Sequence, residues 1–591
     1  MQKLIDAERS ASAVPAPNKM LLRGLIYLSS AWGPAATGPM LADFALRHCY
    51  QAASNGGMRD EKLGNACLWA LSHMPDGAGV PWMGRVWARV KYPKFRTRID
   101  AALNEAAAAC GMSRGELDEL CVPGHGLDAA GRVTLDAGSG TATLTVSGRN
   151  VDLEWRSEAG KPVKAPTSAM KADKAGLAAA KALAKEIEAD LATQMIRLQR
   201  LYIEDRSWPA ELWRQRYLDH PLLGMLARLL IWRVDGPHGC AAAMWAEGRL
   251  RDAAGAPVDD AGAEIRLWHP IDAAPEAVLA WRERIAALQV VQPFAQAWRE
   301  IYRVSDAELV TATYSNRWGG HILKQHQFMS LARLQGWTVT HRMWVDARNN
   351  EPAHLVVPAH GIVADYWVEG AGDPDSPEVL ESNAYVYVTT DRLTFSRIAP
   401  GATTKDSAHG PRRSEAVPVA DVPPVVFSEV MRHCDLFTAV ASIASDPFWY
   451  DRGRGAAHPD QWRRVAMQYW ERESTAELRE AAQIRRAMLE AIVPKLSIAD
   501  RCSFDDRALL VRGNLQSYRI HVGSAAVTIM PLMRHLCIVP AAAEGWEDGR
   551  IYLPFAGDRT LSVILSKAAL LASDDKITDP VILRQLWDSV L

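Results

Sequence analysis

Residues 314–328 are the first of three stretches whose polar side chains could bind a ligand. The segment reads YSNRWGGHILKQHQF, and on a helix His321 and Gln325, four residues apart, would share one face. Asn316 and Arg317 precede a Gly-Gly pair, close to the backbone N–H groups of a helix start, where an anion can bind. A polar helix face that is solvated, or bonded to a neighbouring domain, is the alternative interpretation.

Residues 427–445 form the second stretch, with the sequence FSEVMRHCDLFTAVASIAS. Ser428, Arg432 and Asp435 would share one helix face, and Arg432 can pair with Asp435 across one turn. Together with Glu429, such a pair could hold a ligand carboxylate or phosphate. The structural alternative is that these groups join the helix to a sheet.

The third stretch, residues 518–524, reads YRIHVGS and is predicted to be a strand. Arg519, His521 and Gly523 would lie on one of its faces. A histidine followed by Gly-Ser is similar to the His-Gly-Ser of ADP-ribosyl-transferring folds. Val522 breaks that spacing, however, and the sequence offers no partner Tyr and Glu that can be placed. We therefore keep His521 only as a candidate ligand-binding residue.

Neither cysteines nor histidines predict a metal site. The eight cysteines include no C-x-x-C pair and no Cys/His cluster of zinc-finger spacing. His321 and His326 would lie about 140° apart around a helix. Phosphate-loop, zinc-protease, nucleophile-elbow and protein-kinase motifs are also absent. The sequence thus predicts no structural zinc and no cofactor, and it leaves the catalytic residues unknown.

Composition places the chain among ordinary globular proteins. It has 591 residues, 48% of them hydrophobic and 23% charged, a length that fits about four domains. The formal net charge of -2 does not predict nucleic acid as a partner. The longest apolar runs are too short to cross a membrane. Scattered cysteines and a first segment unlike a signal peptide favour a cytoplasmic location.

Periodicity along the chain predicts an α+β fold with several domains and mainly antiparallel sheets. The predicted order is a helical, repeat-like N-terminal domain, a small β meander, a long bracing helix with a helical pair, an α+β central domain, a mobile linker and an α+β C-terminal domain: 18–121, 122–160, 165–235, 236–400, 401–425 and 426–591. The bracing helix is predicted over 171–203. We expect proteolysis to cut first within 401–418 and to leave 426–591 as a compact fragment.

More local predictions concern the elements around the candidate residues. Helices are predicted over 293–313 and 321–335, and the Asp391-Arg392 step is predicted to turn a β-hairpin between strands 385–389 and 393–398.

Long phrases of the chain resemble the bacterial family called domain of unknown function 4132, also labelled molybdate metabolism regulator-like. They include GNACLWAL at 64–71, VPGHGLDAAG at 122–131, HPLLGMLARLLIW at 220–232, VFSEVMRHCDLF at 426–437 and LPFAGDRTLSVILSKAALL at 553–571. The resemblance extends over about residues 20–586. It implies a regulatory role but no catalytic residue.

These observations predict an interaction or regulatory protein that binds an unknown protein partner, with a small anionic ligand as a further candidate. The alternative is an enzyme whose polar pocket is formed by 314–328 and 426–446 against the C-terminal sheet. An enzyme would bring the His321/Gln325 and Arg432/Asp435 pairs into one concave site, whereas a scaffold would keep them apart or packed in separate cores.

Overall fold

The computed structural model describes residues 16–31, 34–49, 60–90, 93–109, 111, 114–237, 239–339, 352–371, 384–402, 410–445, 478, 480–523, 525–531, 534–536, 538, 559–578, 582–583 and 586. They divide into two compact units. The first falls within Met1–Leu191 and Glu211–Arg228, and the second within Ala192–Ala210 and Leu229–Leu591. The α+β class with antiparallel sheets is confirmed. No helix among the described residues has both the length and the apolar content to cross a bilayer.

The first unit begins with successive helices, as predicted: α2 (Ala16–Ser29), α3 (Pro34–Phe44), α4 (Glu61–Ser72), α5 (Val80–Arg89), α6 (Pro93–Ala109) and α7 (Arg114–Leu120). Their apolar positions meet in one core that includes Ile26, Leu68 and Ile99. Asp60 caps α4 by accepting a hydrogen bond from the Leu63 N–H at 3.1 Å, which satisfies a donor that the helix itself leaves unpaired.

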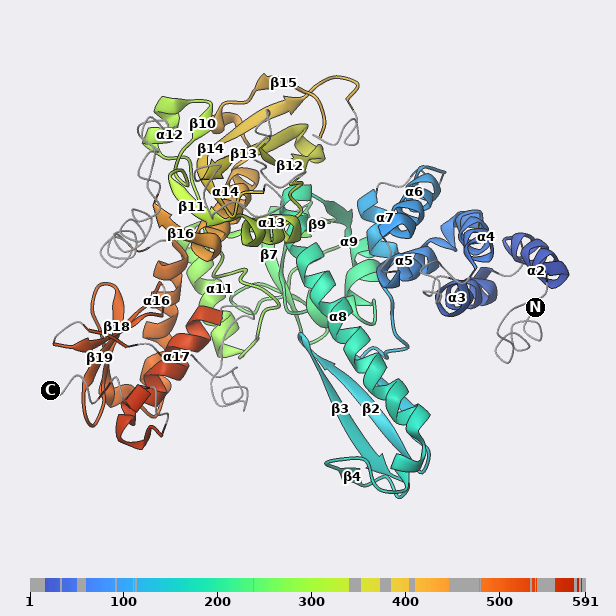
Figure 1. The fold of residues 1–591 in the computed structure, drawn as a ribbon, viewed down its shortest axis with the longest axis horizontal. Helices are drawn as coiled ribbons and strands as arrows, with labels where there is room; N and C mark the ends of the chain where they lie inside the picture. The colour runs from blue at the N-terminus through green and yellow to red at the C-terminus, as the bar shows by residue number, and fades with distance from the viewer. Residues whose placement is uncertain are drawn as a thin grey trace. The chain divides into compact units, whose positions relative to one another are not determined.

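The predicted β meander follows as a four-stranded antiparallel sheet: β1 (Arg132–Asp136), β2 (Gly140–Ser147), β3 (Asn150–Ser157) and β4 (Pro162–Val163). The long helix α8 (Lys174–Glu204) runs along this sheet (Figure 1), and Ala180 shares a small core with Trp155 and Met170. The chain passes from the first unit to the second within α8, between residues 191 and 192.

The second unit starts with a five-stranded sheet in the order β5-β9-β6-β7-β8. Its strands and the short helices between them are β5 (Ser207–Pro209), α9 (Ala210–Trp213), α10 (Leu223–Ala227), β6 (Ile231–Gly236), β7 (Gly239–Ala246), β8 (Arg249–Arg251) and β9 (Glu264–Leu267). α10 and all of α9 after Ala210 lie in the first unit. We did not predict the β6–β7 hairpin, because β7 is rich in alanine, which strands disfavour. Pairing with β6 over six residue pairs overrides that local preference.

A seven-stranded antiparallel sheet forms the middle of the second unit. Its strands are β10 (Tyr314–Ser315), β11 (His321–Lys324), β12 (Ala353–Val357), β13 (Ile362–Ala371), β14 (Tyr387–Ile398), β15 (Arg413–Ala416) and β16 (Ser442–Ser445). The helices α13 (Gln325–Leu334) and α14 (Pro424–Ala441) lie beside this sheet (Figure 1). They contribute Phe328, Phe427 and Phe437 to its core.

The C-terminal part of the second unit has a five-stranded sheet with helices beside it. The elements are α16 (Glu480–Ile492), β17 (Cys502–Phe504), β18 (Ala508–Arg512), β19 (Ser517–His521), β20 (Val527–Met530), β21 (Arg534–Leu536) and α17 (Arg559–Ala572), together with α11 (Pro275–Ala287) and α12 (Asp306–Thr311) earlier in the unit. A predicted helix before 478 and a terminal helix lie outside the described residues.

Three local predictions differ from the structure. Residues 293–305 are irregular, and only α12 forms within the helix predicted over 293–313. Asp391-Arg392 makes no hairpin turn. β14 continues through both residues as one strand. Opposite them, the pairing of β13 with β14 shifts register between Tyr366 and Val368, as at a β-bulge. Within the predicted mobile linker 401–425, β15 pairs with β14, while residues 403–409 lie outside the described residues.

The packing of α14 bears on the predicted C-terminal fragment. Phe427 and Phe437 lie in the core of the middle sheet, and the core of the C-terminal sheet includes Trp281 of α11 and Trp298. We therefore expect an isolated 426–591 fragment to expose these surfaces, aggregate and show no cooperative thermal transition. Circular dichroism melting tests this, with residues 192–591 as the control that contains the whole second unit. A cooperative melt of 426–591 would contradict the expectation.

Candidate functional site

Helix α14 carries four of the predicted candidates and turns most of them inward. Ser428, Glu429 and Asp435 are buried, and Arg432 is half-buried. The helix needs its apolar side for the sheet, so these polar groups face the irregular segment 292–303. Buried polar groups persist only when they are hydrogen-bonded, so the partners of each one decide what it can do.

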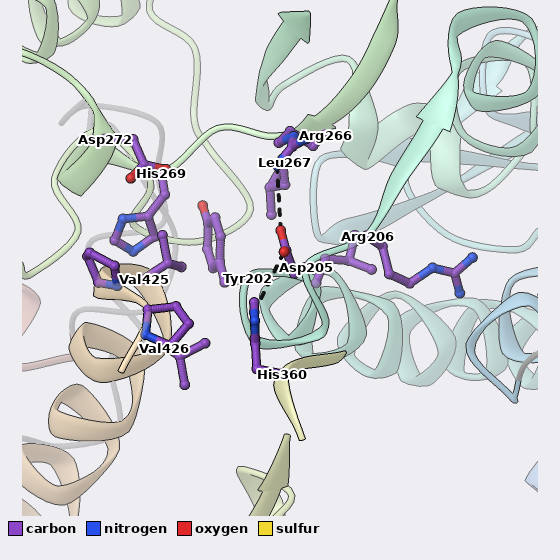
Figure 2. Close-up of a pocket in the computed structure, with 13 residues that line it drawn as sticks. Tyr202, Asp205, Arg206, Arg266, Leu267, His269, Asp272, His360, Val425 and Val426 are labelled. Carbon is purple, nitrogen blue, oxygen red and sulfur yellow. Dashed lines mark ion pairs between the residues drawn. The ribbon is translucent and has the colours of Figure 1, made fainter. Parts of the chain in front are cut away.

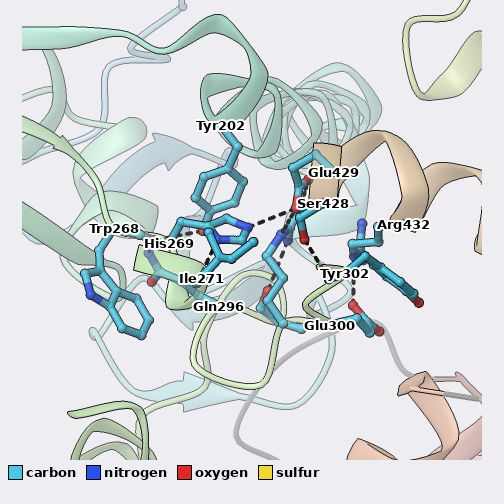
Figure 3. A network of polar contacts seen from close by, with 12 residues as sticks. Tyr202, Trp268, His269, Ile271, Gln296, Glu300, Tyr302, Ser428, Glu429 and Arg432 are labelled. Atoms are coloured by element: carbon cyan, nitrogen blue, oxygen red, sulfur yellow. Dashed lines mark hydrogen bonds and ion pairs between the residues drawn. The ribbon is translucent and has the colours of Figure 1, made fainter. Parts of the chain in front are cut away.

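Glu429 is the centre of a buried ion-pair network (Figure 3). The Arg299 guanidinium donates to both carboxylate oxygens, from Nε at 2.6 Å and from Nη2 at 2.5 Å. The His269 Nε2–H donates to the same carboxylate at 3.1 Å, because its Nδ1 accepts from the Ile271 N–H. Burial alone would raise the pKa of Glu429, but Arg299 and His269 hold it well below its ordinary value.

Three further contacts tie α14 to the same segment. Tyr302 donates its hydroxyl to Asp435 at 2.6 Å, and its backbone N–H donates to Ser428 Oγ at 3.0 Å. Arg432 pairs with Glu300 through Nε at 2.8 Å (Figure 3). The predicted partner of Arg432, Asp435, is thus replaced by a residue from another part of the chain.

The irregular backbone of 292–303 is explained by side chains that bond to other strands. Gln296 accepts from the Ile231 N–H at 2.8 Å and donates to the carbonyls of Ile231, at 2.8 Å, and Trp268, at 3.0 Å. Gln292 donates to Gln296 at 3.0 Å. The Gln296 amide therefore pairs with the backbone of Ile231 in β6 as a neighbouring strand would. A helix over the segment would break these contacts.

The arrangement around Glu429 fastens α14 to residues about 130 positions earlier; it does not present reacting groups to a ligand. Glu429 and Arg299 are each 1% exposed, so a ligand cannot reach either one without local unfolding. A buried pair of this kind fixes the position and orientation of α14 relative to the segment 292–303.

The candidates in 314–328 fall on different elements from those predicted. His321 lies on β11, and α13 begins only at Gln325, so the two do not share a helix face. Gln325 is buried and donates its amide to the Tyr385 carbonyl, while the His321 N–H donates to Thr390 Oγ1 at 3.0 Å. The strand forms because β11 pairs with both β14 and β16.

Asn316 and Arg317 lie in the loop between β10 and β11. Asn316 is exposed. Arg317 pairs with Glu308 and donates to the Arg303 carbonyl at 3.0 Å. The predicted anion site at a helix start is therefore absent from this part of the described chain, because the residues after Gly-Gly form a strand.

His521 ends β19 in the C-terminal sheet, a different sheet from the one that carries His321. Its backbone makes a tight turn in which the Ala525 N–H donates to the His521 carbonyl at 2.8 Å. The nine candidate residues thus separate into the α14 network, the β10–α13 region and the β19 turn.

A cavity of about 150 Å³ lies next to the α14 network (Figure 2). Tyr202 and His269 form part of its wall, and the Asp205 carboxylate lies 3.6 Å from both Arg266 and His360. Ligand pockets are usually larger, about 300–1,000 Å³, so this one fits a small ion or a few waters.

None of the nine candidates and no residue of 314–328 lines the cavity. Its wall comes from four separate stretches, at 201–206, 266–272, 360 and 423–426, none of which contains a candidate residue predicted from the sequence. Burial lowers the pKa of His269, which Glu429 only partly opposes, so the imidazole facing the cavity is neutral.

Comparisons with known proteins identify two regions of the chain. Residues 160–337 match the family described as Domain of unknown function (DUF4132), a narrower span than the predicted resemblance, and 482–586 match Domain of unknown function (DUF7737). The Escherichia coli (strain K12) protein described as "Uncharacterized protein YehI" is 26% identical over 279 residues, or 45% of this chain. The chain spans 23% of that relative's length. No solved structure matches. Two regions of the chain are therefore similar to domain families of unknown function, DUF4132 and DUF7737.

Proposed function

We propose that this chain is a cytoplasmic interaction protein of regulatory type, and that it acts by binding a protein partner through an apolar ridge on α2 and α4. The ridge consists of Met20, Leu21, Tyr27 and Leu28 of α2 with Trp69 of α4. The observation that carries the proposal is its exposure: Met20 is 74%, Leu21 59%, Leu28 57% and Trp69 45% accessible.

The ridge is a second apolar face on a helix that is already packed. Leu22 and Ile26 on the other side of α2 are buried in the helical core. A surface helix needs one apolar face for its own core, so a second such face marks an interaction site.

Its aromatic residues are held in place before any partner binds. The Tyr27 and Trp69 rings meet edge to face with centroids 5.0 Å apart, and Trp69 stacks on His73 at 4.0 Å. Aromatic and Met side chains dominate the centres of protein interfaces, and fixed rings lose little entropy on binding.

The charge of α2 indicates the chemistry of the partner. The helix contains no acidic residue. Lys19 pairs with Asp60 at 2.7 Å, and Arg23 is exposed beside the ridge. A protein segment with an apolar face flanked by carboxylates would match this surface.

The polar candidates support binding over catalysis, since the α14 groups are committed to buried pairs. The enzyme alternative would instead have to use the small cavity of Figure 2, where His269 is bonded at both ring nitrogens and His360 lies 3.6 Å from Asp205.

The test replaces Leu21 and Leu28 together with Asp. The matched control is Leu279→Asp, since Leu279 is 54% exposed on α11 of the second unit. Each purified protein is cross-linked to its neighbours in native extract. The wild type and the control should recover the same partner. The double variant should recover at least about tenfold less, because a charge buried in an apolar interface is strongly unfavourable.

Circular dichroism melting checks that the double variant is folded. Equal partner recovery by a folded double variant would contradict the proposal. Equal loss in Leu279→Asp would also contradict it.

A further inference from the structure

A tight turn in the first unit holds His125 in an unusual backbone conformation. The Leu127 N–H donates to the Gly124 carbonyl at 3.0 Å, and His125 and Gly126 have φ of 52° and 71°. Such values are uncommon for a residue other than glycine. The His125 side chain is only 4% exposed, so the turn places the imidazole inside the unit.

Two carboxylates of α8 face this imidazole. Glu186 and Asp190 are four residues apart, which puts both on one side of the helix. Asp190 Oδ2 lies 2.7 Å from His125 Nε2, and Glu186 Oε1 lies 3.7 Å from Nδ1. Both carboxylates keep partial access to solvent, at 30% for Glu186 and 22% for Asp190.

Ligand atoms from these three residues lie within 4.8 Å of one another. Zn²⁺ bonds of about 2.0–2.2 Å place tetrahedral donors about 3.5 Å from one another, so small rotations of these side chains bring all three to one cation. One imidazole with two carboxylates suits a first-row divalent metal better than Ca²⁺ or Mg²⁺, which prefer oxygen ligands throughout.

We propose that His125, Glu186 and Asp190 form a binding site for a divalent transition-metal cation, represented by Zn²⁺. Three protein ligands leave a coordination position open to water. The metal clamps the 124–127 turn to α8. The proposal differs from the sequence-based prediction of no metal ligands, because spacing along the chain does not place His125 beside α8.

A metal-free interpretation of the same geometry is a simple His125–Asp190 ion pair. Glu186→Gln separates the two, because it removes one metal ligand and leaves the His125–Asp190 contact in place. A structural ion pair would therefore tolerate Glu186→Gln, whereas a metal site would lose affinity.

The experiment titrates Zn²⁺ into the tag-free, chelator-treated full chain at neutral pH by calorimetry. We expect one Zn²⁺ per chain in the wild type, and a loss of at least about tenfold in affinity for Glu186→Gln and for His125→Ala. His326→Ala, which removes an exposed histidine of α13, should bind like the wild type. Zn²⁺ should also raise the melting temperature of the wild type and of His326→Ala, and leave that of Glu186→Gln unchanged.

Three outcomes would overturn the site. They are no Zn²⁺ binding by the wild type, equal affinity in wild type and Glu186→Gln, and a preference for Ca²⁺ or Mg²⁺ over Zn²⁺. If His125→Ala fails to fold, Glu186→Gln alone decides.

Discussion

Replacing Glu429 with glutamine is expected to lower the free energy of unfolding of the second unit by about 3–5 kcal/mol. The substitution keeps the shape of the side chain but removes its charge, so Arg299, 1% exposed, is left as a buried cation without its counter-charge. It also weakens the hydrogen bond from His269. Urea unfolding followed by tryptophan fluorescence measures the change.

Glu490→Gln is the matched control. Glu490 pairs with Arg486 at 2.9 Å on the surface of α16, and its side chain is 47% exposed. Exposed helix pairs of this kind contribute only about 0.3–0.5 kcal/mol. Similar losses in the two variants would show that Glu429 lies in a solvated pair and would contradict the buried network.

The second unit is also expected to lose stability in mild acid, largely through His433. Burial lowers the pKa of His433 to about 3, and the ring accepts a hydrogen bond at Nδ1 from the Trp337 indole N–H at 3.1 Å. In the unfolded chain a histidine has a pKa of about 6.5. Between these two values the unfolded state binds a proton that the folded state does not, so stability falls as the pH falls.

The size of the effect follows from this difference. Each unit below about pH 6.5 costs about 1.4 kcal/mol for a histidine that stays neutral in the fold, so about 2 kcal/mol is lost by about pH 5. The lowered pKa of His269 adds in the same direction. The lowered pKa of Glu429 adds a further loss only below about pH 4.3, the ordinary value of a glutamate.

His433→Gln tests this assignment, because the glutamine amide oxygen can still accept from Trp337. Unfolding free energies measured from about pH 7.5 to about pH 5 should change less steeply in this variant than in the wild type. His326→Gln, at an exposed position, should keep the wild-type slope. If His433→Gln leaves the pH dependence of the unfolding free energy unchanged, then His433 is not the group responsible, which would contradict the prediction.

Local patterns were enough to predict much of the fold. The helical character of 18–121, the β meander, the helix over 171–203 and the strand that carries His521 all appear near their predicted positions. In each of these segments the apolar spacing matches one period over its whole length, so the local preference and the packing agree.

The irregular segment 292–303 shows why other elements could not be predicted. Its composition favours a helix, yet Gln296 and Arg299 gain more from bonding to Ile231 and Glu429 than the backbone would gain from helical bonds. His321 likewise became part of a strand because β14 and β16 were available on either side. Preferences of a fraction of a kcal/mol per residue yield to such tertiary contacts.

Local sequence patterns predict the fold class, most of the helices and the polar face of α14 that holds Ser428, Glu429, Arg432 and Asp435. The roles of these four residues depend on tertiary contacts, because their partners lie about 130 positions away. The same holds for His125, whose carboxylates are more than sixty residues further on. Spacing along a chain encodes which residues share a face of one element, whereas the pairing of charges between elements depends on how those elements pack.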